Sequence, residues 1–559
     1  MSIFSQPQKV KIKRNTFNLT HDRKFTTNFG NLTPVQVQEV MPGDTFYLKS
    51  SVMVRFAPMV APILHQVDCL IDHFFVPYRI LWPNWEKFIA GTGEDVQPQP
   101  LPLPDPQPQQ WPETHVVHPY IEFPLTNTDT GNGKLPPQGS LADYMGAPCE
   151  GKLLNTEIAD ADQKIQINAL PFAAYGKIYN EYYRDEDLST TLKDFVSDGN
   201  NSSTLFRERL AQTAYTKDLF TSARPWAQKG SEAMLPISDG EVLWRQRPAG
   251  ETRWPKWVSP TGVNASGAVS AEGNSVSAGN TTQAGYDPGG SLWVNFSDAS
   301  IVNLRRALAL QDFLETRARF GSRYIEHLYG QYGVVSSDAR LQRPELIGSQ
   351  KTAIKISEVL NQTGSVKTES ATNTNSPLPQ GNMAGHGIAY GGAKTAKYYC
   401  EEFGVIMSIM RIRPRASYMH HIPRYLLKND PFDYAVPKFA HIGEQAVWKA
   451  EVALEKDKAQ EARNTWGYTP RYAEYKTAVN TVHGEFLTTM DTWHMARKYQ
   501  GATPALNQSF IEVAANSQDF ARIFAVNPVV NNVDPIWCQV LNETKVNRKL
   551  PYFGNPKII

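Results

Sequence analysis

The sequence has no apolar run long enough to cross a membrane. Its longest apolar stretch, Phe403–Met410, is interrupted by Gly404 and Ser408, whereas a bilayer needs about twenty consecutive apolar residues. The polar start at Met1–Lys9 also lacks the apolar core of a secretion signal. We therefore expect a soluble protein that spans no membrane and is made inside a cell.

Cysteine is scarce, and the charges of the two signs balance. The four cysteines lie far apart without a Cys-x-x-Cys spacing, so we expect reduced, buried thiols rather than a disulfide framework. Lysine and arginine number 56 against 55 acidic residues, which gives a net charge of +1. Because the overall field is weak, any binding of nucleic acid would depend on local basic patches.

Motifs of enzyme chemistry are missing from the sequence. His115 and His118 lie three residues apart, but no third metal ligand accompanies them in this proline-rich segment. The glycines of 385–392 lack the spacing of a dinucleotide-binding loop, and no phosphate-binding loop or zinc-protease motif occurs. We therefore predict a protein with no catalytic residue, no metal and no cofactor.

The clearest feature that is present is a pair of strands. In Thr45–Phe56 the even positions are mostly apolar and the odd positions mostly polar, which is the period of a strand with one buried face. A similar alternation fills Val67–Phe75, after a link that contains Pro58 and Pro62. Together they predict an antiparallel pair in an all-β domain.

Two later segments also have strand character, and they lie far along the chain. Tyr398–Pro414 is apolar on both faces, as in a strand covered on two sides, and Ile536–Leu550 comes almost at the end. Pairing between the ends of the chain is typical of a Greek-key or jelly-roll sheet that carries insertions. Helices are predicted at residues 83–90, 168–186, 300–330 and 451–463.

An aromatic stripe marks the second of these helices. Its rings recur at spacings of three and four residues, at Phe172, Tyr175, Tyr179 and Tyr182. Such a stripe is more often core than a stacking platform for bases or sugars. We therefore interpret it as core.

Several segments read as extensions of one domain that covers residues 44–559. Residues 1–43 form a basic extended arm, which is either a solvated tail or reaches a neighbouring subunit or phosphates. Alternating prolines predict a stiff surface strap within 96–140 rather than a ligand for an aromatic groove. The segments 228–296 and 364–392 are inserted loops, because their stretches rich in Gly, Ser, Thr and Asn cannot bury a core.

The segment Met410–Lys428 combines basic and aromatic side chains with no acid among them. This mixture suits single-stranded nucleic acid, whose phosphates attract the cations and whose bases stack on the rings. It suits equally a protein interface whose carboxylate partners lie elsewhere in the fold. The sequence leaves these two alternatives open.

Several blocks, taken in their shared order, resemble the major capsid protein of microviruses and specifically of the gokushovirus branch. They extend from the N-terminal arm to about Arg497 and include Asn18-Leu-Thr-His-Asp, Val54-Arg-Phe-Ala-Pro-Met-Val-Ala-Pro-Ile, His73-Phe-Phe-Val-Pro-Tyr-Arg-Ile-Leu-Trp, Phe439-Ala-His-Ile-Gly-Glu-Gln and Gly467-Tyr-Thr-Pro-Arg-Tyr. The sequence departs from the family pattern at Glu451–Arg463, where the predicted helix is lengthened, and at Met419-His-His-Ile.

The resemblance implies a mainly β fold, an eight-stranded antiparallel jelly roll of the viral capsid type with helical segments and long inserted loops. Sixty copies would close an icosahedral shell around a single-stranded DNA genome. A small basic viral protein would help to package the DNA, and assembly into the virion would take place in the cytoplasm of the bacterial host. The insertion at 228–296 matches a protrusion that would contact a host cell-surface receptor.

Two sets of site residues follow from these readings. Contacts with nucleic acid are predicted for basic residues of the arm and of Met410–Lys428, namely Lys9, Lys11, Lys13, Arg14, Arg411, Arg413, Arg415 and Arg424. Host contacts are predicted in the insertion, at Trp244, Trp254, Trp257, Asn264, Glu272, Asn274 and Asn280. The three tryptophans also leave a carbohydrate-binding, lectin-like β protein as an alternative. A glycoside hydrolase is a less favoured one, because it needs two carboxylates roughly 5–10 Å apart in a cleft.

Overall fold

The chain divides into two compact units in the computed structural model. The first consists of Met1–Ala227 and Val334–Ile559, and the second is Gln228–Gly333. The second unit begins where the sequence places the start of an insertion, and it also contains the helix that follows that insertion. The structure describes residues 13–90, 116–124, 135–153, 164–203, 209–229, 242–244, 269–272, 275–278, 292–294, 301–320, 342–360, 383–392, 395–515 and 517–553.

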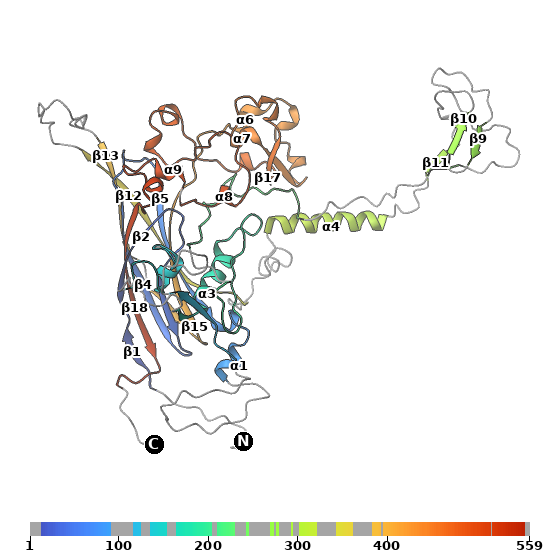
Figure 1. The fold of residues 1–559 in the computed structure, drawn as a ribbon. Coiled ribbons are helices and arrows are strands. Elements are labelled where there is room, and N and C mark those ends of the chain that lie inside the picture. Colours follow the sequence, from blue (N-terminus) through green and yellow to red (C-terminus); the bar gives the residue numbers. More distant parts are fainter. Residues whose placement is uncertain are drawn as a thin grey trace, which may run out of the picture. The chain divides into compact units, whose positions relative to one another are not determined.

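The first unit is built on one curled antiparallel sheet (Figure 1). Its strands follow the order β1-β18-β4-β13-β12-β5-β15-β3, with β2 beside β18 and β14 beside β4. The fold is the expected jelly roll, although the described residues supply 10 strands to this sheet instead of eight. The strands are β1 (Asn15–Asn18), β2 (His21–Thr27), β3 (Thr33–Val40), β4 (Thr45–Phe56), β5 (Val67–Pro77), β12 (Glu345–Leu360), β13 (Met383–Gly392), β14 (Ala396–Tyr399), β15 (Gly404–Pro414) and β18 (Ile536–Arg548).

The predicted strands β4 and β5 both form, but the prediction that they pair with each other is wrong. β4 lies between β18 and β13, and β5 lies between β12 and β15. The link between them contains Pro58 and Pro62, and proline removes backbone donors that a tight hairpin would use. Met59, in the middle of the link, instead forms bridges with Gly385 and Phe524. The link therefore connects two strands of the same sheet that β13 and β12 separate.

The predicted pairing of the two chain ends is confirmed. β18 runs antiparallel to β4 from the pair Ile536–Phe56 to the pair Asn547–Thr45. The other edge of β18 pairs with β1 and β2, and β3 pairs with β15. Most of the described part of the expected arm, from residue 15 to residue 40, is thus integrated into the sheet.

Strand β13 lies inside the segment 364–392, which the sequence analysis predicted to be a surface loop. This prediction is wrong for residues 383–392. The glycines of β13 explain the error. An added Cβ at Gly387 would lie 2.6 Å from the Phe56 ring, and one at Gly391 would lie 2.5 Å from the Thr352 methyl group. The strand is rich in glycine because neighbouring side chains fill the space where its own would lie. Residues 361–382 of the expected loop lie outside the described residues.

Strand β15 is covered on both sides, as its apolar faces predicted. Val405 and Met407 belong to the hydrophobic cluster that includes helix α3 (Leu170–Ile178), whereas Ile406 belongs to a cluster with residues of β4 and β18. The aromatic stripe of α3 and of the π-helical turn Tyr179–Tyr183 is core, as interpreted from the sequence. Tyr175 is fully buried, and its hydroxyl donates a hydrogen bond to the carbonyl of Leu32 at 2.8 Å.

Short elements make up the rest of the first unit. The region between β15 and β18 gathers at the end of the sheet away from β1 (Figure 1). It contains α6 (Arg424–Leu427), β16 (Glu444–Trp448), α7 (Lys449–Val452), β17 (Thr465–Pro470), α8 (Gln508–Ile511), α9 (Gln518–Ala521), α10 (Pro528–Asn531) and 3-10 turns at Pro431–Asp433, Pro437–Phe439, Ala459–Glu461, Ala473–Tyr475, Gly484–Leu487 and Asp491–Trp493. The earlier part of the chain adds a 3-10 turn at Tyr78–Ile80, α1 (Trp85–Ala90), α2 (Leu141–Met145) and the paired strands β6 (Tyr120–Pro124) and β7 (Lys164–Asn168).

The helix predicted at Glu451–Arg463 does not form. Only the turn α7 is helical before Ala453 takes an extended conformation, and a single 3-10 turn follows at Ala459–Glu461. Thr503 holds this extended chain, because its hydroxyl donates to the carbonyl of Ala453 at 2.9 Å. The charge pattern resembled a helix, but tertiary hydrogen bonds decide the conformation.

The described residues of the second unit form two small strand pairs and one long helix. β8 (Val242–Trp244) pairs with β11 (Leu292–Val294), and β9 (Val269–Glu272) pairs with β10 (Ser275–Ala278). α4 (Ile301–Phe320) forms the first part of the helix predicted at 300–330. α4 carries several arginines, and none of the described helices is apolar and long enough to cross a membrane.

Candidate functional site

The basic residues of Met410–Lys428 are distributed over two different environments. Arg411 and Arg413 lie on β15, where they face β5. The guanidinium of Arg411 forms an ion pair with Asp72 at 3.1 Å and lies 4.7 Å from the centroid of the Tyr183 ring. The side chain of Arg413 donates to the carbonyl of Ala214 at 3.4 Å, and burial lowers the pKa of its guanidinium.

Arg424 lies in α6 and turns inward, where it meets two carboxylates. Its guanidinium is 3.0 Å from Glu451 and 3.7 Å from Glu474, and it donates to the carbonyl of Ala446 at 2.8 Å. It also stacks over Trp448, with 4.1 Å between Cζ and the ring centroid. Burial raises the pKa of the Glu451 carboxyl, and the adjacent Arg424 offsets part of this rise.

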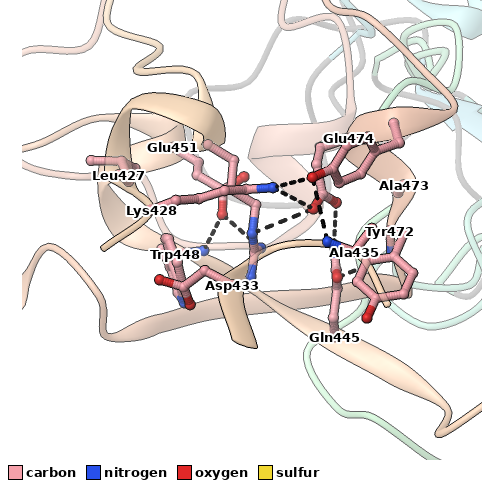
Figure 2. Close-up of polar contacts among 12 residues, drawn as sticks. Leu427, Lys428, Asp433, Ala435, Gln445, Trp448, Glu451, Tyr472, Ala473 and Glu474 are labelled. Atoms are coloured by element: carbon pink, nitrogen blue, oxygen red, sulfur yellow. Dashed lines mark hydrogen bonds and ion pairs between the residues drawn. The ribbon is translucent and has the colours of Figure 1, made fainter. Parts of the chain in front are cut away.

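Lys428 extends this arrangement on the side of Glu474. Its ammonium donates to the Tyr475 hydroxyl at 2.8 Å and lies 3.9 Å from Glu474. Gln445 on β16 donates to the other oxygen of Glu474 at 2.6 Å. Lys428, Glu451 and Glu474 point toward one another in Figure 2.

A second arginine, Arg463, belongs to the same group of charged residues. Arg463 forms an ion pair with Asp433 at 2.8 Å and lies over Trp448, with 4.7 Å between Cζ and the ring centroid. We call the residues Arg424, Lys428, Asp433, Glu451, Arg463 and Glu474 the charge cluster. It contains equal numbers of cations and carboxylates. Arg424 thus has carboxylate partners in the cluster, and Arg411 has its own partner in Asp72.

Large apolar side chains are exposed in the same stretch of chain as the charge cluster, and two of them, Tyr434 and Tyr475, lie against Lys428. Each of them exposes at least 56% of its surface, and they are Tyr425, Leu426, Phe432, Tyr434, Ile442 and Tyr475. We call these six residues the aromatic surface. The single turn of α6 explains its first two members, because a turn that points Arg424 inward points the next two residues outward. Concentrated apolar exposure of this kind marks sites of protein association.

The other predicted nucleic-acid contacts are more exposed or lie outside the described residues. Lys13, Arg14 and Arg415 are exposed, and the guanidinium of Arg14 lies 5.8 Å from the centroid of the Tyr399 ring. Lys9 and Lys11 are outside the described part of the chain. The structure thus places Arg411 and Arg413 on β15 and Arg415 just after its end at Pro414, and it separates Arg424 from them.

The predicted host contacts belong to the second unit. Trp244 ends β8 and Glu272 ends β9. Trp254, Trp257, Asn264, Asn274 and Asn280 lie outside the described residues. No motif in the sequence singles out Phe432, Tyr434 or Ile442. Their one available signal is that large apolar residues recur in a proline-containing segment without strand or helix periodicity.

The histidines do not form a metal site within the described ranges. No group of three His, Cys, Asp or Glu side chains there is placed to hold a metal ion. His118 instead packs edge-on against Trp82, with 5.7 Å between the ring centroids. His65, His483 and His494 line a pocket of about 220 Å³, and burial lowers the pKa of His65 to about 4.

Comparison with known proteins places these features in a family. The model of the family described as capsid protein (F protein) matches residues 5–558. The capsid protein VP1 of Bdellovibrio phage phiMH2K is 31% identical over 525 residues, which cover 91% of this chain and 90% of that protein. VP1 of Chlamydia phage 1 is 27% identical over 91% of each chain. VP1 of Spiroplasma virus 4 is 26% identical over 99% of this chain and 97% of that protein.

These relatives confirm the resemblance to gokushovirus capsid proteins. They give no support to a lectin or to a glycoside hydrolase, because all three are structural proteins of virus shells. The jelly-roll sheet agrees with the same conclusion. The chain belongs to the F-protein capsid family and is a structural, non-enzymatic subunit that assembles with further copies into the shell of a bacteriophage.

Proposed function

We propose that the aromatic surface is a contact between neighbouring copies in a closed icosahedral shell of sixty subunits around a single-stranded DNA genome. The observation that carries this proposal is the exposure of its six large apolar side chains within one segment of the fold. Removing such side chains from water is the main favourable term in protein association. A shell subunit needs surfaces of this kind at each of its contacts.

The charge cluster next to the aromatic surface supports this role. Its ion pairs and the stacking of two arginines on Trp448 fix the backbone that presents Phe432 and Tyr434. A contact surface that is already ordered loses less conformational entropy when it binds. Aromatic residues at the centre of an interface also tend to dominate its binding free energy.

Further partners belong to the same proposal. The exposed cations Lys13, Arg14 and Arg415 are candidates for contacts with the enclosed DNA. A small basic viral protein would supply the positive charge for packaging that a chain of net charge +1 lacks. Residues 228–296 would meet a host receptor, and assembly would occur in the bacterial cytoplasm.

The test replaces apolar residues of the aromatic surface by serine. We expect the double variant Phe432→Ser, Tyr434→Ser to give a folded subunit that forms few or no shells in electron micrographs. Phe195→Ser is the matched control, because Phe195 is an exposed ring outside the aromatic surface. Circular dichroism establishes that each variant is folded. Normal shells from the folded double variant would contradict the proposed contact.

A further inference from the structure

The outward face of the sheet carries a second exposed group of aromatic and basic residues. Strands β2, β18, β4 and β13 lie side by side there, and alternation directs every second side chain away from the core. One row across these strands consists of Thr26, Trp537, Arg55 and Ile388. The next row consists of Lys24, Gln539, Met53 and Tyr390. We call these eight residues the sheet platform.

The platform exposes rings that a sheet covered by protein would bury. Tyr390 exposes 79% of its surface and Trp537 exposes 48%, and Met53 and Ile388 are exposed beside them. The opposite faces of the same strands are fully buried, for example at Val54 and Val540. Flat aromatic side chains on an exposed sheet can stack against bases of any sequence.

The charge on this face differs from the balance of the whole chain. Outward positions of these strands and their neighbours hold Lys24, Lys49, Arg55, Lys355, Lys397 and Lys545, against the carboxylates of Asp22 and Glu543. Both carboxylates are already paired, Asp22 with Lys24 at 2.7 Å and Glu543 with Lys49 at 2.8 Å. Within the described residues, Arg55, Lys355, Lys397 and Lys545 form no ion pair with a carboxylate, which leaves a basic surface.

A hollow beside Trp537 gives this surface a place for a ligand. Its volume is about 430 Å³, and it is lined by Lys24, Phe25, Thr26, Met53, Arg55, Trp537, Cys538 and Gln539. The lining offers an indole ring for stacking, two cations for a phosphate, and amide and hydroxyl groups for hydrogen bonds. Those are the groups that proteins use to hold an unpaired nucleotide.

We propose that the sheet platform binds the single-stranded DNA of the genome, with a base on Trp537 and phosphates on Arg55 and Lys24. This inference rests on the proposed function, in which the shell encloses such DNA. A second copy of the chain that docks through the same face fits less well, because two basic surfaces repel each other. The proposal thus assigns the DNA contact mainly to residues that the charge pattern of the sequence did not reveal.

The first experiment uses intact particles with their own genome. Ultraviolet irradiation joins DNA to aromatic side chains that it touches, and mass spectrometry of the digested protein locates the nucleotide-bearing peptides. We expect cross-links in the peptides that contain Trp537 or Tyr390. Particles with DNA but with cross-links only in other peptides would overturn the sheet platform. Particles that contain no single-stranded DNA would instead overturn the proposed function.

The second experiment measures binding of a fluorescent oligothymidylate to full-length subunits released from particles, at several salt concentrations. Trp537→Ala should weaken binding at least about fivefold with an unchanged salt slope, because stacking does not release counterions. Arg55→Ala should lower the slope of log K against log salt by about 0.7.

Matched controls come from the loop after α3. Lys193 lies over the exposed ring of Phe195 at 3.2 Å, so Phe195→Ala and Lys193→Ala remove the same kinds of groups elsewhere. We expect both to bind as the unchanged protein does. Equal affinities for Trp537→Ala and the controls would refute the platform. The platform would also be refuted if Trp537→Ala reduced subunit association or glycan binding but left DNA binding unchanged.

Discussion

The guanidinium of Arg424 lies 3.0 Å from the carboxylate of Glu451, and the two side chains expose only 11% and 2% of their surfaces. Glu451 also accepts a hydrogen bond from the backbone of Trp448 at 3.0 Å. The pair therefore joins α6, which carries part of the aromatic surface, to the start of α7. Removing one partner of a buried pair is costly because the other charge stays buried.

Glu451→Gln should therefore lower the free energy of unfolding by about 3 kcal/mol. Urea unfolding of the unassembled subunit, followed by tryptophan fluorescence, measures this change. Glu461→Gln is the control, since Glu461 pairs with Lys449 on a more exposed part of the same segment, and exposed pairs contribute little. Equal unfolding midpoints for the two variants would show that the buried pair has no special role.

Acid should weaken the fold through His73. This histidine is buried on β5, its Nδ1 lies 2.6 Å from the Ser408 hydroxyl, and burial lowers its pKa to about 4. The unfolded chain then binds the proton more tightly than the folded chain. The contribution of neutral His73 is complete above about pH 6.5 and is lost as the pH falls toward 4, by about 3 kcal/mol.

His73→Gln isolates this effect, because glutamine does not titrate. We expect the variant to be less stable than the unchanged chain at pH 7 and to lose less stability between pH 6.5 and pH 4. Urea midpoints at four pH values compare the two chains. Parallel curves would mean that His73 does not titrate differently in the folded state.

Replacing two glycines of β13 by alanine should affect the stability of the subunit to different degrees. A Cβ at Gly385 would overlap the backbone carbonyl of Ala61, which cannot move without shifting the link between β4 and β5. Gly385→Ala should destabilise the subunit by about 1–3 kcal/mol. Gly392→Ala, whose Cβ would meet only the Ser51 hydroxyl at 3.3 Å, should be tolerated. Thermal unfolding ranks the two variants, and equal midpoints would contradict the close approach at Gly385.

The cysteines should resist alkylation in the folded subunit. All four are buried without a disulfide bond, and burial raises the pKa of Cys69 to about 12 and raises that of Cys538 as well. Because the thiolate is the reactive form, iodoacetamide at pH 8 should label Cys69 and Cys538 only after unfolding in urea. Mass spectrometry counts the labels, and fast labelling of the native subunit would contradict this burial.

Deletion of Thr261–Gly285 should leave shell assembly intact and reduce attachment to host cells. This stretch has no aromatic residue and one charged residue, Glu272, so it cannot support a core. Electron microscopy scores assembly, and a cell-binding assay scores attachment. The prediction fails if the shortened chain no longer forms shells.

Local patterns in the sequence correctly predicted the strands β4, β5, β15 and β18 and the core helix. The alternation of Thr45–Phe56 is β4, the two-sided apolar run is β15, and the aromatic stripe is the buried face of α3. Each of these patterns depends on neighbours two to four residues away, which the sequence itself supplies. The family assignment came instead from the resemblance of sequence blocks in their shared order. Local periodicity does not provide such a resemblance.

The sequence by itself determined that the segments of β4, β5, β15 and β18 are strands, that the chain ends meet, and that the protein belongs to a capsid family. Only the tertiary structure decided that β4 pairs with β18 and β13 instead of β5, and that the glycine-rich residues 383–392 are a strand. It also decided that Arg411 and Arg424 meet Asp72 and Glu451, whereas Arg55 and Trp537 face outward together. The reason is physical: strand partners, ion pairs and exposed faces depend on residues beyond the local stretch of the chain, often hundreds of positions apart, whose meeting only the folded chain determines.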